Sequence, residues 1–205
     1  WDAYTQEDGH VAHSENGNIA CDHYHHFKDD VKMMKKMGIR NYRFSISWTR
    51  VLPDGTGKVN QKGLQFYSDL VDELLANGIE PLVTLFHWDY PLALHQKGGW
   101  LNRDSSDWFA EYAKVVVDAL SDRVKYWMTI NEPQVFIGCG YAIGKFAPFQ
   151  KLPVRDLAQM CHNVLLAHGK TVKMIRECAK KTPKIGFAFS TPCTTPTDNS
   201  PLAIE

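Results

Sequence analysis

The chain has 205 residues, of which 44% are hydrophobic, so a single packed domain spanning residues 1–205 is the simplest expectation. Its 23 basic and 23 acidic side chains balance, and no block of like charge occurs. No apolar run approaches the ~20 residues of a membrane span. The composition therefore excludes partners that need a basic surface, such as nucleic acid, and it excludes a membrane-spanning protein.

The cysteines are odd in number and form no C-x-x-C pair. Cys161 and Cys178 fall in one predicted helix, where a spacing of ~1.5 Å per residue puts them about 25 Å apart, too far for a disulfide. We expect buried, free thiols in a reducing compartment, and the sequence has no N-x-[ST] site. The expected location is the cytoplasm. The five are Cys21, Cys139, Cys161, Cys178 and Cys193.

The first predicted unit is a helix followed by a strand. Asp22 is placed to cap the helix, and Gly38 is placed to end it. The strand follows at residues 41–47. The apolar positions that share one helix face are Phe27, Val31, Met34 and Met37.

The same order, helix and then strand, is predicted three more times. The helices have periodic apolar residues over 64–75, 108–119 and 157–175, and the strands that follow them span 81–86, 126–130 and 185–189. Short apolar strands alternating with long amphipathic helices predict an α/β fold with a parallel sheet and both faces covered.

Two architectures use such units, the doubly wound open sheet and the eight-stranded barrel. A doubly wound sheet usually has a glycine-rich phosphate loop directly after its first strand. The only candidate, GCGYAIG at 138–144, lies well beyond its strand, and we interpret it as a turn-rich loop. The unusual polar residues lie at the ends of strands, where barrels carry their chemistry, so we predict a (β/α)8 TIM barrel with four of its eight strands in this chain.

Polar or charged side chains follow or interrupt three of the predicted strands. Arg43 lies inside the first strand, and a buried guanidinium implies an acidic partner. His87 and Trp88 follow the second strand, and an imidazole beside an indole suits a sugar, with hydrogen bonds to hydroxyls and a flat apolar surface. Each of these also has an ordinary structural explanation, an internal ion pair for Arg43 and a satisfied polar group for His87.

The third strand ends in Asn131-Glu132-Pro133. Proline disfavours helical geometry in the residue before it, so we expect Glu132 to be extended and to project above the sheet. A carboxyl at this position is suited to proton donation. The structural alternative is a glutamate at the start of a helix.

The run DHYHH at 22–26 has the residue types of a metal site. His23 and His26 open a helix, however, and no second cluster of ligands follows. We therefore expect capping and packing from this run, and no metal.

Several long segments resemble glycoside hydrolase family 1, the β-glucosidase family, in order and spacing. They are NGNIACDHYHHFKDDVKMMKKMGIRNYRFSISWTRVLPDGTGKVN, PLVTLFHWDYPLALHQKGGW and WMTINEPQ. The resemblance runs from Trp1 to about Phe189. It implies a retaining β-glycosidase on a TIM barrel that hydrolyses terminal β-D-glucosides without a cofactor.

The resemblance also implies roles for individual residues. Glu132 would be the general acid/base, and Arg43 would bond the nucleophilic glutamate. Asn131 would bond the sugar 2-hydroxyl, His87 another hydroxyl, and Trp88 would line the sugar pocket.

The second carboxylate of the reaction is missing from the expected position. The family carries it in a segment of the form (Ile/Val)-Thr-Glu-Asn-Gly, and the only Glu-Asn-Gly here, at 15–17, precedes the first helix. Asp89 is the nearest local substitute. We expect one strand before Trp1 and three after Glu205, so the isolated chain, with only the acid/base half, should be inactive and need the rest of the barrel.

Two other functions remain open on the sequence. One is a non-catalytic sugar-binding protein of the same fold, against which the intact Glu132 argues. The other is a 6-phospho-β-glycosidase, although Trp88 and the Asn131–Pro133 segment favour unphosphorylated sugars.

Overall fold

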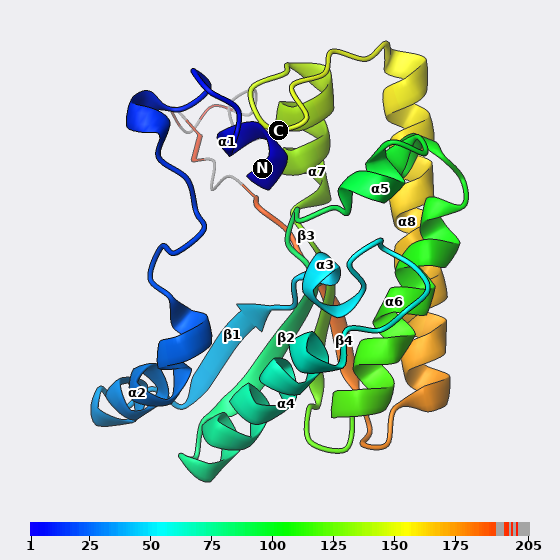
Figure 1. Cartoon of the computed structure of the whole chain (residues 1–205). Helices are drawn as coiled ribbons and strands as arrows, with labels where there is room; N and C mark the ends of the chain where they lie inside the picture. Colours follow the sequence, from blue (N-terminus) through cyan, green and yellow to red (C-terminus); the bar gives the residue numbers. More distant parts are fainter. Residues whose placement is uncertain (192–194, 197, 199, 201–205) are drawn as a thin grey trace.

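The computed structural model describes residues 1–191, 195–196, 198 and 200. Its centre is a parallel sheet whose strands follow the chain in the order β1-β2-β3-β4 (Figure 1). Each predicted strand is present, with ends that differ by one or two residues. The strands are β1 (Asn41–Ser45), β2 (Glu80–Phe86), β3 (Tyr126–Asn131) and β4 (Lys184–Ala188).

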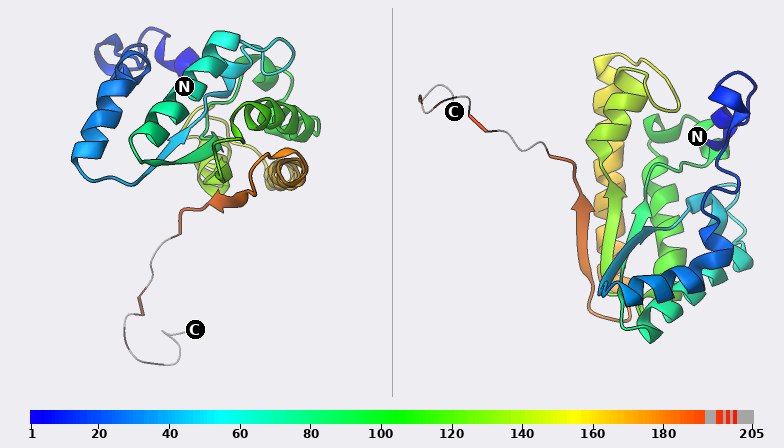
Figure 2. Two further views of the ribbon diagram at one scale, coloured as in Figure 1. Left: turned by 90° about the horizontal axis from the view of Figure 1, so that it is seen from below. Right: turned by 90° about the vertical axis from the view of Figure 1, so that its left-hand side faces the viewer.

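The long helices α4, α6 and α8 each precede a strand and lie on one side of the sheet (Figure 2). The prediction that both faces are covered is wrong. Right-handed connections between strands that are neighbours in chain order place the connecting helices α4, α6 and α8 on the same face. The helices are α1 (Asp2–Thr5), α2 (His23–Lys36), α3 (Trp48–Val51), α4 (Gln61–Ala76), α5 (Leu92–His95), α6 (Ser105–Leu120), α7 (Pro133–Ile137) and α8 (Val154–Cys178), with shorter turns η1 (Ala12–Ser14), η2 (Gly99–Leu101) and η3 (Gly138–Ala142).

An aromatic core fixes the carboxyl ends of β1 and β2 against α6. Trp48 stacks on Tyr112 with ring centroids 4.9 Å apart, and both side chains are fully buried. The Tyr112 hydroxyl donates a hydrogen bond to the Leu85 carbonyl at 2.8 Å. A buried hydroxyl needs such a partner, so this bond sets the height of α6 relative to the end of β2.

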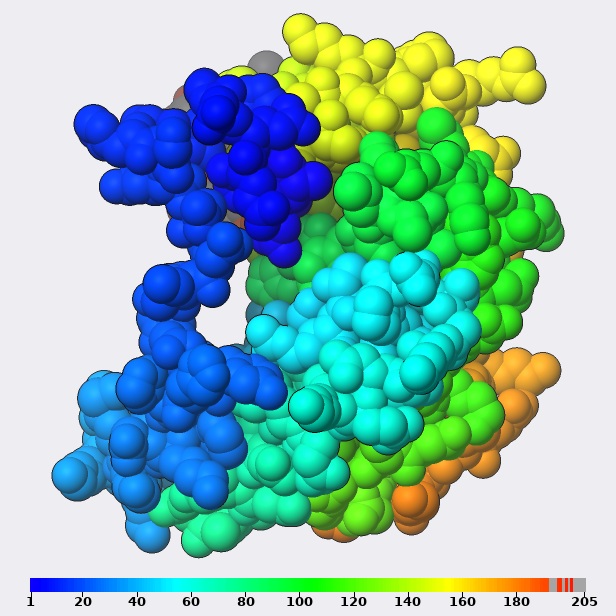
Figure 3. Space-filling model, in the orientation of Figure 1, coloured from blue at the N-terminus to red at the C-terminus, as the bar shows by residue number. Residues whose placement is uncertain are grey.

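The N-terminal segment departs from the compact part of the molecule. In the space-filling view it runs, in dark blue, from α1 to α2 and leaves an opening beside the sheet (Figure 3). β1 is the outermost strand on this side, and its residues alternate between exposed and half-buried. The face of β1 that carries Arg43 is therefore open in this part of the chain.

Two local predictions are corrected by the backbone. Asp22 precedes α2 but makes no side-chain cap; its backbone is left-handed (φ +49°) and its carboxylate accepts a hydrogen bond from His25 Nδ1 at 2.7 Å. His23 Nδ1 likewise contacts the Asp30 carboxylate, at 2.5 Å. Residues 138–142 continue α7 as the π-helical turn η3 and do not form the predicted turn-rich loop.

The cysteines within the described residues are free thiols. Cys161 and Cys178 both lie in α8, as predicted. Cys21 and Cys161 are exposed and Cys139 and Cys178 are half-buried, so the expectation of buried thiols is wrong for all four. Cys193 lies outside the described residues. Within the residues that the structure describes, no helix combines the length and hydropathy needed to cross a bilayer.

Candidate active site

Asn131, the last residue of β3, is the centre of a hydrogen-bonded cluster that joins three strand ends. Its side chain is only 2% exposed. Arg43 Nη2 donates to Asn131 Oδ1 at 2.6 Å, and Asn131 Nδ2 contacts His87 Nε2 at 3.1 Å. Trp88 Nε1 donates to the Asn131 carbonyl at 2.9 Å. These hydrogen bonds bring the side chains of three neighbouring strands together at one edge of the sheet.

Arg43 fixes the orientation of the Asn131 amide. A guanidinium can only donate, so the amide oxygen faces Arg43 and the amide NH₂ faces His87. His87 Nε2 therefore accepts, and the proton of the neutral ring lies on Nδ1. Partial burial and the nearby Arg43 charge lower the pKa of His87, while Glu132 opposes this shift. At neutral pH the His87 ring is thus uncharged, with Arg43 as a neighbouring cation and Glu132 as a neighbouring carboxylate.

The surroundings of Arg43 differ from the prediction. Its Nε donates to Thr84 Oγ1 at 2.9 Å, so both side-chain partners are neutral. Among the described residues no carboxylate forms an ion pair with it. Arg43 is also exposed, not buried, because β1 is an outer strand of this sheet. The Arg43 guanidinium can therefore still form an ion pair with a carboxylate.

Glu132 is the residue directly before α7 and has a strained backbone conformation; its side chain makes no capping hydrogen bond. Its φ and ψ are +42° and +60°, which is left-handed and not extended as predicted. Pro133 disfavours the right-handed helical region, and the Glu132 N–H donates to the Ala188 carbonyl at 2.7 Å, which holds the turn. Non-glycine residues in this region store strain that is common at functional sites. The side chain is half-buried at the end of β3.

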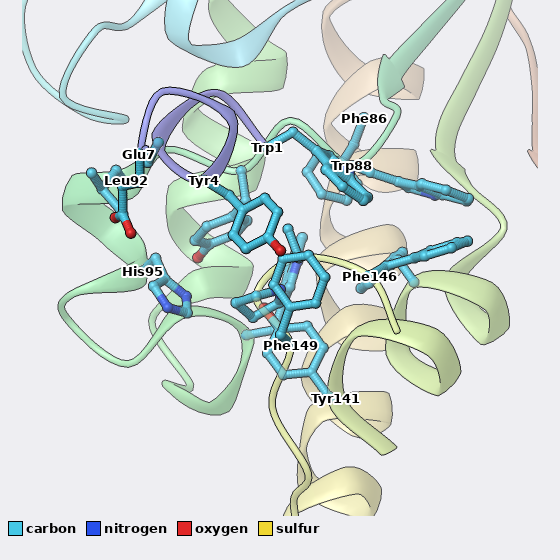
Figure 4. Close-up of a pocket in the computed structure, with 16 residues that line it drawn as sticks. Trp1, Tyr4, Glu7, Phe86, Trp88, Leu92, His95, Tyr141, Phe146 and Phe149 are labelled. Carbon is cyan, nitrogen blue, oxygen red and sulfur yellow. The ribbon is translucent and has the colours of Figure 1, made fainter. Parts of the chain in front are cut away.

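An aromatic cavity of about 250 Å³ is lined in part by Trp88, which also belongs to the Asn131 cluster (Figure 4). Trp1 and Tyr4 line it from α1, and Phe146 and Phe149 line it from the segment after η3. The Phe146 ring lies 5.9 Å from the Trp88 ring and so supports its far side. Neither this wall nor Thr84 was predicted from the sequence, although the closely spaced phenylalanines of FAPF at 146–149 were an available signal.

Comparison with known proteins identifies the family. Residues 1–204 match the profile of glycosyl hydrolase family 1.

The chain belongs to glycosyl hydrolase family 1.

Similar proteins of this family are glycosidases. The chain is 47% identical over 190 residues to a 1,4-β-D-glucan glucohydrolase of Thermotoga neapolitana, covering 93% of this chain and 44% of that protein. It is 47% identical over 176 residues to a 6-phospho-β-galactosidase of Clostridium acetobutylicum, covering 86% and 36%. The β-glucosidase of Thermotoga maritima in complex with deoxynojirimycin superimposes with a TM-score of 0.92 at 45% identity, covering 100% and 46%.

The chain therefore spans less than half the length of these relatives. Its four-stranded sheet is part of the (β/α)8 barrel of the family, as predicted.

Proposed function

We propose that the protein is a retaining β-glycosidase acting on terminal β-D-glucosides and that this chain supplies the acid/base half of its site. The observation that carries the proposal is the Asn131 cluster, which gathers Arg43, His87 and Trp88 beside Glu132. Family membership and β-glucosidase relatives support the same reaction class.

In the first step Glu132 gives its proton to the glycosidic oxygen while a second carboxylate attacks the anomeric carbon. The bond to the aglycone breaks and a glycosyl-enzyme forms. In the second step Glu132 takes a proton from water, which attacks the anomeric carbon and releases the sugar and the carboxylate. The second carboxylate would come from a segment outside the described residues. The guanidinium of Arg43, whose side-chain hydrogen-bond partners are both neutral, would pair with that carboxylate and keep it ionised.

The remaining groups of the cluster can bind the sugar. Asn131 uses one amide hydrogen on His87 and one oxygen lone pair on Arg43, which leaves one donor and one acceptor for a hydroxyl. His87 retains Nδ1–H as a donor. The indole of Trp88 offers an apolar face to the sugar ring.

Stereochemistry tests this proposal directly. When the complete protein hydrolyses p-nitrophenyl β-D-glucoside, ¹H NMR during the first minutes should show β-glucose before mutarotation. Retention requires two carboxyls ~5–5.5 Å apart. α-Glucose as the first product would contradict the double displacement, and binding without hydrolysis would favour a non-catalytic sugar-binding protein.

A 6-phospho-β-glycosidase is the second candidate, because one relative is a 6-phospho-β-galactosidase. A phosphate is usually held by several cationic or N–H donors, and the Asn131 cluster contains one cation, Arg43. The proposal therefore favours unphosphorylated glucosides. Parallel assays with p-nitrophenyl β-glucoside and its 6-phosphate should give the higher kcat/KM for the former, and the reverse ratio would select the second candidate.

A further inference from the structure

The turn that carries two sugar-binding candidates, residues 87–89, has an unfavourable backbone. Trp88 has φ +84°, a region that non-glycine residues avoid. The Tyr90 N–H donates to the Trp88 carbonyl at 3.0 Å, which closes the turn locally. Strain of this kind persists only where neighbouring groups hold it, so the turn needs an anchor outside itself.

Asp89 contacts the neighbouring strand end and is such an anchor. Its Oδ2 accepts the backbone N–H of Trp48 at 3.1 Å, and Trp48 is the fully buried first residue of α3, directly after β1. Its Oδ1 is also buried and has no hydrogen-bond partner within the described part of the chain. The carboxylate thus lies between the end of β2 and the start of α3, with Oδ1 shielded from solvent.

This burial decides between two roles for Asp89. A nucleophile must reach an anomeric carbon, but Oδ1 of Asp89 is buried and Oδ2 is engaged by the Trp48 N–H. Burial also raises the pKa of the Asp89 carboxyl to about 6, although the hydrogen bond from the Trp48 N–H opposes the shift. Both observations argue against the local-substitute nucleophile that the sequence left open.

The turn is linked in the other direction to the Asn131 cluster. Trp88 Nε1 donates to the Asn131 carbonyl and His87 Nε2 accepts from the Asn131 amide. We propose that Asp89 is a positioning residue that fastens the turn after β2 to the start of α3 and thereby holds Trp88 and His87 against Asn131. The consequence for sugar binding rests on the proposed function, whereas the positioning of Trp88 does not.

The test compares three variants of the complete protein, each measured well below its Tm. Asp89→Ala removes the acceptor, and Asp89→Asn keeps an oxygen that can accept the Trp48 N–H. Asp54→Ala, at an exposed acid of the loop after α3, is the control. Asp89→Ala should raise both the Kd for deoxynojirimycin and the KM for p-nitrophenyl β-glucoside about tenfold, while Asp89→Asn stays within threefold and the control is unchanged. A lower Tm with Kd and KM within twofold of wild type would overturn the proposal.

A local readout separates this inference from the proposed function. The indole N–H resonance of Trp88, assigned with Trp88→Phe in ¹⁵N-tryptophan-labelled protein, should shift in Asp89→Ala and stay in Asp89→Asn. If the wild type neither binds deoxynojirimycin nor cleaves glucosides, the proposed function fails, and this resonance alone decides the positioning role. If Asp89→Ala does not fold, Asp89→Glu, which displaces the acceptor by one methylene, should give the same shift. An unchanged resonance in the folded variant overturns the inference.

Discussion

The burial of Asp89 predicts a measurable pH dependence of stability. Burial raises the pKa of its carboxyl from 3.8 to about 6 in the folded protein, a difference of about two units. At about 1.36 kcal/mol per unit, this corresponds to about 3 kcal/mol. Because the folded pKa is raised, the carboxyl contributes its full stability below about pH 4, and this contribution is lost as the pH rises through about 6.

The assay is urea unfolding of the complete protein and of Asp89→Asn between pH 4 and pH 7. All other titrating groups are shared, so the difference between the two free energies of unfolding isolates Asp89. Wild type should lose about 2 kcal/mol relative to Asp89→Asn over this range, most of the full difference. The same comparison with Asp54→Asn, at an exposed acid, should be flat. A flat difference for Asp89→Asn as well would refute the reasoning from burial.

Three further predictions concern the proposed site. Arg43→Gln should lower kcat/KM of the complete enzyme at least a hundredfold and move the acidic limb of its pH profile to higher pH, because the nucleophile loses the cation that lowers its pKa. An acidic limb at the wild-type pH would show that Arg43 does not act on the nucleophile. His87→Ala should raise KM for glucosides about tenfold. Wild-type KM should stay constant from pH 8 to below pH 6.5, because the pKa of His87 is lowered and the ring remains neutral there. A rise of KM centred at pH 6.5 or above would contradict this reasoning. Residues 1–205 alone should not hydrolyse p-nitrophenyl β-glucoside, and turnover that Glu132→Gln abolishes would reveal a nucleophile within this half.

Much of the fold and the membership of the candidate site follow from sequence patterns. The four strands and their helices have periodic apolar residues, and parallel strands must bring their carboxyl ends to one edge. That rule alone places Asn131 beside His87 and Trp88, as the hydrogen bonds confirm. The motifs that resemble glycoside hydrolase family 1 contain the same residues, Asn131, His87 and Trp88.

Other features depend on interactions that a one-dimensional pattern does not contain. The left-handed backbone of Glu132 results from Pro133 together with a hydrogen bond to Ala188, a residue 56 positions later. Arg43 is exposed because the described sheet ends at β1. The role of Asp89, which follows β2, depends on a hydrogen bond from Trp48, which begins α3 after β1. Each requires knowledge of which segments meet in space.

The most direct test of the central claim is the reaction of the Glu132→Gln variant of the complete enzyme with two substrates. Nitrophenyl glucosides, whose nitrophenolate leaves without needing a proton, should still form the glycosyl-enzyme, and added azide should restore turnover by attacking the anomeric carbon of this intermediate. Cellobiose, which needs the proton, should lose about 10²–10⁴-fold in rate, whereas the control Glu15→Gln, at an exposed loop residue, should behave as wild type. Equal losses for both substrates, with no azide rescue, would contradict the assignment of Glu132 as the acid/base.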